Sequence, residues 1–331
     1  MSYMAKHEAY ELKQMQSLPL DIKIRMTKER IEQWYNYWDG MVYVSFSGGK
    51  DSTVLKHIVD SMYDDVPAVF VNTGLEYPEI QKFAMSQKNV VTVRPEMRFD
   101  EVIKKYGYPV VSKEVAQTVW EAKKNAKTGK YAYRIKKLNG ELLDKNGKYS
   151  SYNIPKWKFL LDAPYNISHK CCDVMKKRPA KTYERKTGRK AIIGTLASES
   201  TLRKTQWVKY GCNAFESKRP TSQPLSFWTE QDILHYIKQF DVPYCSVYGD
   251  IVPDNEGTLL KTTGCDRTGC IFCMFGCHLE KEPNRFQRLK ETHPRQYEYC
   301  IGGGEMVDGK WQPSKEGLGL GKVLDYINVK Y

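Results

Sequence analysis

The 331-residue sequence lacks any apolar run near the ~20 residues that a membrane-spanning helix needs, so we expect no membrane partner. Its first residues, MSYMAKHEAYELKQM, lack the apolar stretch of a secretory signal. Internal repeats and low-complexity tracts are also absent from the printed sequence. These absences predict a folded cytoplasmic protein and leave its oligomeric state open.

Acidic residues are the minority among the charged side chains. The 52 Lys and Arg residues exceed the 39 Asp and Glu residues, which gives a formal net charge of +13. Such an excess favours anionic partners, namely nucleotides or nucleic acid. Cysteine, by contrast, is not scarce: the chain has nine, including an adjacent pair and a CxxC. An odd number with these spacings favours metal or redox chemistry in the cytoplasm over disulfides.

The segment VSFSGGKDSTVL (44–55) follows a β-branched, aromatic stretch and leads into apolar residues at helical spacing. A strand, a glycine-rich turn and a helix start leave backbone N–H groups aimed at one point, which makes an anion site. An ordinary turn with a capping side chain is the alternative. The Walker spacing is absent, so the β/γ-phosphate chemistry of kinases is not predicted. We expect six residues to hold phosphate here, namely Ser47, Gly48, Gly49, Lys50, Asp51 and Ser52.

Strands and helices alternate after this segment. VPAVFVNTGLEYPEI is typical of a strand, a turn and a helix that begins near Pro78. NVVTVRP predicts a third strand, and FDEVIKKYG predicts a helix that ends at Gly107. This alternation predicts an α/β fold with a doubly wound, mostly parallel sheet. The ligand site should lie at the carboxyl ends of its strands, where the turn residues Asn72, Thr73 and Gly74 also stand.

Three regions are predicted along the chain: a helical segment (1–38), a nucleotide-binding domain (39–242) and a cysteine-rich region (243–331). A basic insertion at about 123–160 interrupts the domain, and its two Asn–Gly pairs, at 139–140 and 146–147, predict hairpin turns. Residues 123–137 hold seven Lys or Arg and no acid, interleaved with tyrosines. That composition suits tRNA or DNA as well as a solvated face.

Six segments, in this order, resemble the phosphoadenosine phosphosulfate (PAPS) reductase family within the wider PP-loop ATP pyrophosphatases. The resemblance runs from about residue 42 to residue 273 and implies an adenine nucleotide α-hydrolase-like fold. The implied ligand is ATP, accompanied by Mg²⁺, or adenylylsulfate (APS) or PAPS. The segments are SGGKDS (47–52), NTGLEYPE (72–79), CCDVMKKRPAKTY (171–183), IIGTLASESTLR (192–203), QPLSFWTEQDILHYI (223–237) and TGCIFC (268–273).

The resemblance also assigns roles to single residues. It implies that Glu199 and Arg203 lie near the anionic end of the nucleotide. Lys50, Asp51 and Arg203 are the implied catalytic residues. In members of this superfamily that use ATP, cleavage falls between the α- and β-phosphates.

Four cysteines, Cys171, Cys172, Cys270 and Cys273, resemble the CC…CxxC arrangement that binds a [4Fe–4S] cluster in APS-type reductases. Physically, adjacent thiolates suit a cubane, whose irons are separate, better than a single metal ion. The pairs stand far apart in the sequence, so the fold must bring them together.

A local alternative uses four cysteines close in sequence. Cys265-x4-Cys270-x2-Cys273-x3-Cys277 begins with the spacing of plant-type ferredoxins, and a zinc knuckle also fits. His278 is a further candidate ligand in this segment. The adjacent pair would then consist of buried core thiols.

Three functions remain open. The first is a sulfurtransferase that adenylylates a nucleic acid or small acceptor with loss of pyrophosphate and then adds sulfur from a donor protein. The second is an APS or PAPS reductase that forms sulfite with a thiol reductant, and the third is a non-catalytic nucleotide- or nucleic-acid-binding module. Assimilatory reductases resemble one another in a nucleophilic cysteine within a C-terminal ECGxH-type tail. Here the last cysteine is Cys300, in EYCIGGGEM, so we favour the sulfurtransferase.

Overall fold

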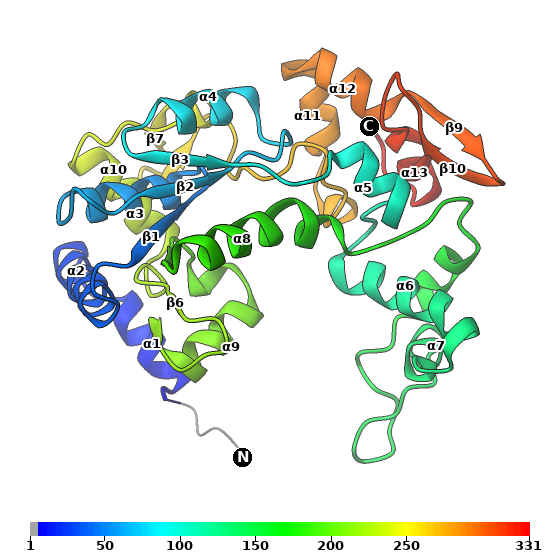
Figure 1. Ribbon diagram of the computed structural model, residues 1–331, viewed down its shortest axis with the longest axis horizontal. Helices are drawn as coiled ribbons and strands as arrows, with labels where there is room; N and C mark the ends of the chain where they lie inside the picture. The colour runs from blue at the N-terminus through cyan, green and yellow to red at the C-terminus, as the bar shows by residue number, and fades with distance from the viewer. Residues whose placement is uncertain (1–5) are drawn as a thin grey trace. The chain divides into compact units, whose positions relative to one another are not determined.

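The computed structural model describes residues 6–331, with the side chains of residues 125–128 left undescribed (Figure 1). The first five residues of the predicted helical segment 1–38 therefore lie outside the described residues. Contacts divide the chain into two compact units. The first unit contains the chain up to Asn72, with Glu76–Arg94 and Pro179–Thr268; the second contains Thr73–Leu75, Pro95–Arg178 and Gly269–Tyr331. Within residues 6–331, no helix is both long and apolar enough to cross a membrane.

The first unit is built on a six-stranded sheet of order β3-β2-β1-β4-β6-β5, counted within the described residues. All neighbouring strands are parallel except β5 and β6, which are antiparallel. The predicted α/β fold with a mostly parallel sheet is therefore confirmed. The strands are β1 (Val42–Phe46), β2 (Ala68–Val71), β3 (Val90–Val93), β4 (Lys190–Ile193), β5 (Asn213–Ala214) and β6 (Thr221–Ser222), and β7 (Ile251–Pro253) pairs with β8 (Leu260–Thr262) in a separate ribbon.

Side chains on both faces of the sheet are buried. Successive side chains of a strand point to opposite faces, so a single strand contributes to two different core clusters. On β1, Val42, Val44 and Phe46 enter the large core cluster, whereas Tyr43 lies in a second cluster against Tyr183 of α8. The helices of this unit are α1 (Ala9–Gln16), α2 (Leu20–Tyr37), α3 (Lys50–Asp60), α4 (Pro78–Ser86), α8 (which begins at the unit boundary, Arg178–Thr187), α9 (Thr201–Tyr210) and α10 (Glu230–Gln239).

Helix α10 begins with a reciprocal pair of capping hydrogen bonds. The Thr229 hydroxyl accepts a hydrogen bond from the backbone N–H of Asp232, and the Asp232 carboxylate accepts one from the backbone N–H of Thr229. The same carboxylate accepts a hydrogen bond of 2.7 Å from the buried ammonium of Lys23 on α2. This buried ion pair ties α2 to α10 within the unit that carries the glycine-rich turn.

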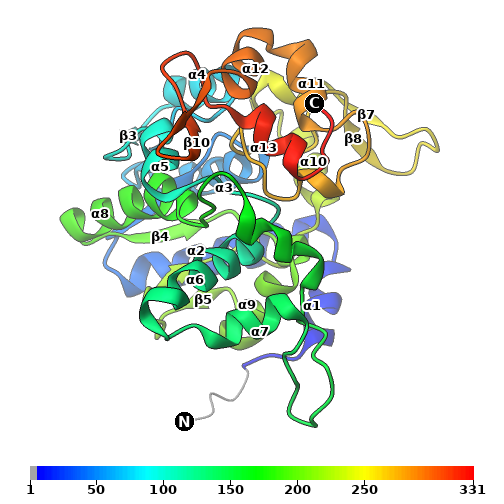
Figure 2. The same ribbon diagram turned by 90° about the vertical axis from the view of Figure 1, so that its right-hand side faces the viewer.

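The second unit is mostly helical and carries one antiparallel ribbon, β9–β10. Its longest helix, α6, packs against α7, and both views show the two side by side (Figures 1 and 2). The elements are α5 (Phe99–Tyr106), α6 (Lys113–Thr128), α7 (Ala132–Asn139), the 3-10 turns η1 (Pro155–Asp162) and η5 (Cys277–Leu279), the π-helical η2 (Asp173–Lys177), α11 (Arg285–Thr292), α12 (Pro294–Ile301), β9 (Gly304–Val307), β10 (Lys310–Pro313) and α13 (Leu320–Tyr326).

The basic insertion contains one hairpin turn where the sequence predicts two. Leu143 and Tyr149 form an antiparallel bridge around the turn at 146–147, as predicted. The pair at 139–140 instead ends helix α7, with Gly140 in the left-handed conformation (φ +82°). Left-handed backbone serves both a helix C-terminus and a hairpin turn, so an Asn–Gly pair alone does not separate them.

Candidate functional site

The glycine-rich turn joins β1 to α3 and is held by hydrogen bonds of its own serines. The Ser52 hydroxyl donates to the Gly49 carbonyl (2.9 Å) and accepts from the backbone N–H of Ser47 (3.1 Å). The two serine hydroxyls are 3.0 Å apart. Because these bonds fix the backbone before α3 begins, the turn is preorganised where N–H groups of a helix start converge.

The two glycines in the turn are required for different reasons. Gly48 has φ +73°, and an added Cβ would stand 3.0 Å from Ile80 Cγ2 on α4. Gly49 has ordinary dihedrals, but its Cβ would approach the hydroxyls of Tyr248 and Thr268 at 3.3 and 3.4 Å. A side chain at Gly49 would therefore occupy the space in front of the turn.

Lys50 is almost fully buried at the first position of α3, and its charge is already neutralised. Its ammonium pairs with the Glu230 carboxylate (2.7 Å) and donates a hydrogen bond to the Asp266 carbonyl. Its backbone N–H donates to the Tyr248 hydroxyl (3.3 Å), whose pKa burial raises to about 12. The lysine is thus positioned by groups of the first unit rather than left mobile.

Two arginines converge on Glu199. Both Arg203 and Arg267 form ion pairs with its carboxylate, which is about 15% exposed. Glu199 precedes α9 in a 3-10 turn, and the Ser200 hydroxyl accepts a hydrogen bond from the Arg203 backbone N–H (3.3 Å). Burial and the neighbouring Arg267 lower the pKa of Arg203, whereas Asp51 raises it.

Asp51 lies within the electrostatic reach of the same groups. Burial raises the pKa of its carboxyl and the Glu230 carboxylate adds to the rise, while Lys50, Arg267 and Arg203 oppose it. The predicted residues Lys50, Asp51, Glu199 and Arg203 are therefore brought together in the first unit. They form one charge cluster beside the turn.

The three residues predicted after β2 divide between the units. Asn72 is buried in the first unit, where its amide lies 3.8 Å from Met85 Sδ. Thr73 and Gly74 belong to the second unit. Their part in nucleotide binding stays a prediction.

Sequence reasoning missed the segment that lies over the turn. Residues 263–268 bring the Asp266 carbonyl to Lys50, Arg267 to Glu199, and the Thr268 hydroxyl to within 2.7 Å of the Tyr248 hydroxyl. The excess of basic residues was the only signal, and it does not identify Arg267. Residues 263–268 lie about 200 residues from the turn in the sequence, so no local sequence pattern predicts these contacts.

The second unit collects the four predicted cluster cysteines. Cys171 and Cys172 directly precede η2, and their sulfurs are 3.9 Å apart. Cys270 and Cys273 belong to one turn, closed by a 3.1 Å hydrogen bond from the Cys273 N–H to the Cys270 carbonyl. All four side chains are half-buried. The two pairs, distant in sequence, are close enough to influence one another electrostatically.

The hydrogen bond between Cys171 and Cys172 shifts the pKa values of the two thiols in opposite directions. The hydrogen bond to Cys172, burial, and the charges of Cys172, Cys273 and Cys270 all raise the pKa of Cys171. The same hydrogen bond lowers the pKa of Cys172, and Lys176 lowers it further. Thiolates gathered this way are stabilised by cationic charge placed among them. Within residues 6–331, however, no three or more His, Cys, Asp or Glu side chains converge as a metal-binding group.

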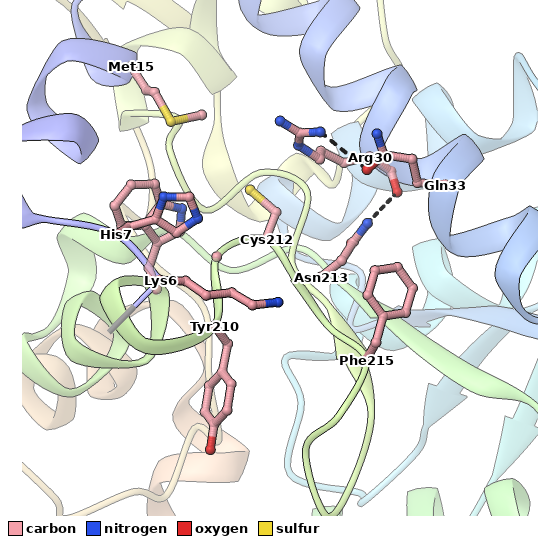
Figure 3. A pocket seen from close by; sticks show the side chains of 11 residues that line it. Lys6, His7, Met15, Arg30, Gln33, Tyr210, Cys212, Asn213 and Phe215 are labelled. Atoms are coloured by element: carbon pink, nitrogen blue, oxygen red, sulfur yellow. Dashed lines mark hydrogen bonds between the residues drawn. The ribbon is translucent and has the colours of Figure 1, made fainter. Parts of the chain in front are cut away.

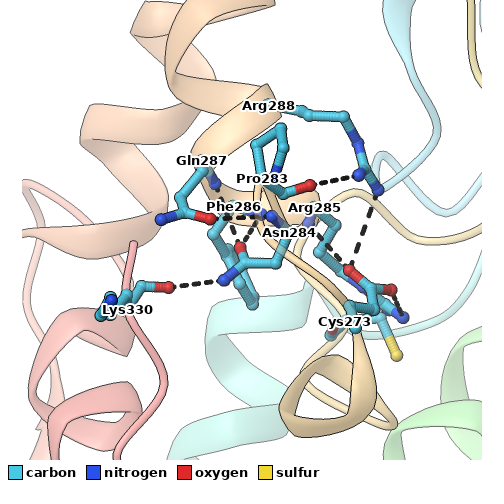
Figure 4. A network of polar contacts seen from close by, with 9 residues as sticks. Cys273, Pro283, Asn284, Arg285, Phe286, Gln287, Arg288 and Lys330 are labelled. Atoms are coloured by element: carbon cyan, nitrogen blue, oxygen red, sulfur yellow. Dashed lines mark hydrogen bonds and ion pairs between the residues drawn. The ribbon is translucent and has the colours of Figure 1, made fainter.

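A polar network holds Cys273 in place (Figure 4). The Arg285 guanidinium donates to the Cys273 carbonyl (2.9 Å) and pairs with Glu280. Asn284 caps α11 through its side-chain oxygen, and its amide donates to the Lys330 carbonyl (2.8 Å). The loop that carries the CxxC is therefore fixed to a helix and to the end of the described chain.

The remaining cysteines of the local alternative behave differently. Cys277 is buried, its thiol donates to the Met274 carbonyl (3.0 Å), and burial raises its pKa to about 11. Cys265 belongs to the first unit. Cys300 lies on α12 with none of its surface exposed, and burial raises its pKa. Cys277 and Cys300 thus have the surroundings of structural thiols.

Fewer cations of the basic insertion are available to a partner than its composition suggests. Arg134 pairs with Glu121 (2.6 Å) and Lys137 pairs with Glu114, so acids of α6 neutralise two of its seven cations. Lys127 is a cation whose side chain lies outside the described residues. Tyr133 within this stretch is exposed, and the most exposed aromatic rings of the insertion lie further along, at Tyr149 (78% exposed) and Tyr152 (71% exposed).

Comparison with known proteins places the chain in a family. The family model described as the phosphoadenosine phosphosulfate reductase domain matches residues 41–275, more than half of the sequence. The chain belongs to this family. The PAPS reductase family is part of the adenine nucleotide α-hydrolase-like superfamily, and its members bind nucleotide substrates such as APS and PAPS.

Two individual similarities accompany the family match. An uncharacterized protein of Methanocaldococcus jannaschii is 23% identical over 257 residues, which cover 76% of this chain and 45% of that protein. The chain thus spans less than half the length of that relative. The crystal structure of a PAPS reductase from Candida auris, a phosphate complex, has a TM-score of 0.37 and 16% identity over 74% of this chain and 91% of that one. That similarity is too distant to transfer residue roles.

Proposed function

We propose that this member of the PAPS reductase family is an ATP-dependent sulfurtransferase rather than a sulfite-forming reductase. The burial of Cys300 carries this choice. A reductase needs an exposed thiolate that attacks sulfur, and Cys300 is a helix residue whose burial raises its pKa. The non-catalytic module is disfavoured because a charge cluster faces the turn.

In this proposal the turn holds the phosphates of ATP. The backbone N–H groups at the start of α3 and the Lys50 ammonium bind them, and Mg²⁺ accompanies the nucleotide. Arg203 and Arg267 exchange Glu199 for the nucleotide's anionic end. An oxygen on a carbon of the acceptor then attacks the α-phosphorus, and pyrophosphate leaves with the electron pair of the broken α–β bond. Sulfide-level sulfur from the donor next attacks the carbon that carries the adenylylated oxygen, and AMP leaves with the electron pair of the broken carbon–oxygen bond.

A [4Fe–4S] cluster on Cys171, Cys172, Cys270 and Cys273 is part of the proposal. Their side chains fit such a group in chemistry: four soft sulfur donors gathered in one unit, with lysines lowering the pKa of Cys172. When bound, the cluster would hold or deliver sulfur. The chain's own part is to present the four sulfurs, with the Cys273 loop fixed by Arg285.

The proposed acceptor is a nucleic acid or a small molecule. For nucleic acid the support is the exposed Tyr149 and Tyr152 in the basic insertion, since bases stack on such rings. Filter binding of tRNA and single-stranded DNA to wild type and to Tyr149→Ala/Tyr152→Ala tests this part. Equal retention by both proteins would favour a small acceptor.

The deciding experiment measures two products. With ATP, a sulfur source and acceptor, the protein should release pyrophosphate; with APS or PAPS and a thiol reductant, it should release no sulfite. Cys300→Ala, which keeps the site apolar, should retain the pyrophosphate activity, and Lys50→Ala should lose it. Rapid sulfite release that disappears in Cys300→Ala would make the protein a reductase instead.

A further inference from the structure

A separate cavity of about 280 Å³ lies in the first unit, among α1, α2 and α9 (Figure 3). It shares no lining residue with the glycine-rich turn. The chain preceding α1 contributes Lys6 and His7, α2 contributes Arg30, and the end of α9 with its following loop contributes Trp207 and Cys212. Its lining combines cationic side chains, aromatic rings and a buried hydrogen-bond donor.

The cations of the cavity lack acidic partners. Among residues 6–331, no carboxylate forms an ion pair with Lys6 or Arg30. The guanidinium of Arg30 donates to the Gln33 side chain (3.2 Å) and lies close enough to the Cys212 thiol to lower its pKa. Glu11 of α1 accepts a hydrogen bond from His7 Nδ1 (3.2 Å), a lining residue other than the two cations. Elsewhere in this unit, Lys50 and Arg203 are paired with acids. The cavity therefore keeps positive charge available for an anion.

A buried hydrogen-bond donor in the wall also lacks a partner. Trp207 is 3% exposed, and its indole Nε1 forms no hydrogen bond within the described part of the chain. Burial raises the pKa of the Cys212 thiol, and Ser226, the Trp207 indole N–H and Arg30 lower it, so Trp207, Arg30 and Cys212 meet at this wall. The sulfur lies outside hydrogen-bond geometry with the indole, which leaves Nε1 without an oxygen or nitrogen acceptor among residues 6–331. Buried N–H groups are almost always paired in folded proteins. An acceptor atom in the cavity would satisfy this one.

Aromatic rings complete the lining. The His7 ring stacks on Trp207 with centroids 4.8 Å apart and planes 26° apart. Phe215 extends an aromatic group with Trp34 (centroids 5.0 Å). Figure 3 shows the Lys6 ammonium reaching between Tyr210 and Cys212. Flat rings beside free cations suit a ligand that carries both a planar ring and a negative charge.

We propose that this cavity is a second ligand site, which binds a small organic anion with a planar ring, of the class of a nucleoside 5′-monophosphate. The ring packs against Phe215 and the Trp207 wall, an acceptor atom takes the indole N–H, and Lys6 and Arg30 hold the anionic group. The volume is just below the range of sites for drug-sized ligands, which suits a mononucleotide better than a dinucleotide.

The test uses three probes that separate ring from charge. UMP carries both, uridine carries the ring alone, and ribose 5-phosphate carries the charge alone. Isothermal titration of the full chain, with its glycine-rich turn saturated by ATP, should show UMP binding at least tenfold tighter than either of the others. Equal affinity for UMP and ribose 5-phosphate would overturn the proposal, as would no UMP binding.

Matched variants locate the site. Arg30→Gln and Phe215→Leu should each weaken UMP binding at least fivefold, with circular dichroism confirming the fold. Lys13→Gln, on an exposed position of α1 outside the lining, should not. UMP affinity that falls in Lys50→Ala but not in Arg30→Gln would assign UMP to the turn and refute the second site. Failure of pyrophosphate release, in contrast, bears only on the proposed function.

Discussion

The glycine-rich turn and the cysteine group differ in how their charges are balanced. In the turn, Lys50 already has Glu230, and the two arginines already share Glu199. The four cysteines have each other, and their ionised forms repel. The turn can therefore persist without a ligand, and the proposed function requires it to exchange these internal partners for phosphate. In our proposal the cysteine group, in contrast, gains its balance from the bound cluster.

The largest expected effect is on the cysteine side of this comparison. Protein purified without oxygen should be brown and contain about four irons per chain. Cys171→Ser and Cys273→Ser should each lose the colour and nearly all iron, because each removes one of four ligands. Iron analysis and visible absorption measure this.

Cys277→Ser is the matched control for the cysteine variants. Its thiol is buried and bonded to the Met274 carbonyl, so iron should be retained. A bleached Cys277→Ser protein beside a brown Cys171→Ser protein would show that the local ferredoxin-like set holds the metal.

The next effect concerns the turn. Lys50→Ala should weaken ATP binding by about 2 kcal/mol, roughly 30-fold, since a buried ammonium that binds phosphate is removed. Isothermal titration gives the affinity. Lys56→Gln, on the same helix but paired with Asp60, serves as the control and should bind ATP normally. Unchanged affinity in Lys50→Ala would contradict phosphate binding at the turn.

Removal of an internal partner should act in the opposite direction. Glu230→Gln frees Lys50 from its carboxylate, so ATP should bind about two- to fivefold more tightly, a modest gain because Glu230 is half exposed. The same titration measures it. Weaker binding in this variant would mean that Glu230 supports the nucleotide instead of competing with it.

The smallest effect is on the pH dependence of stability. Burial raises the pKa of Asp51, so the folded protein holds this proton more tightly than the unfolded chain. Its stabilising contribution is complete below the unfolded pKa, near 3.8, and is lost as pH rises through the folded pKa. Asp51→Asn should therefore gain stability over wild type as pH increases. Melting temperatures across this range, with ATP absent, test it; a constant difference would contradict it.

The sequence predicts what is local. The strand–turn–helix around Gly48 and Gly49 and the cap of α10 at Thr229 follow from neighbouring residues. The partners of Lys50 do not, since Glu230 and Asp266 reach it through the fold. Likewise, no residue near Asp232 in the sequence predicts its ion pair with Lys23.

The cysteine pairs show a different limit. Their gathering was implied by family resemblance and not by spacing, because about 100 residues separate Cys172 from Cys270. The turn at Gly140 shows a third limit, since its left-handed backbone is common to two kinds of structure. Sequence patterns therefore do not predict contacts between distant residues, and they do not distinguish two structures that share one local conformation.

The nine cysteines differ in burial, so their thiols should react with a reagent at different rates. Five thiols are half-buried and four are buried, so a thiol reagent should modify the first group quickly and the second only as the fold opens. If four of the half-buried thiols bind a cluster, a single rapid reaction remains, at Cys265. The number of fast-reacting thiols would then report cluster occupancy, and the slow phase would report unfolding, in one sample.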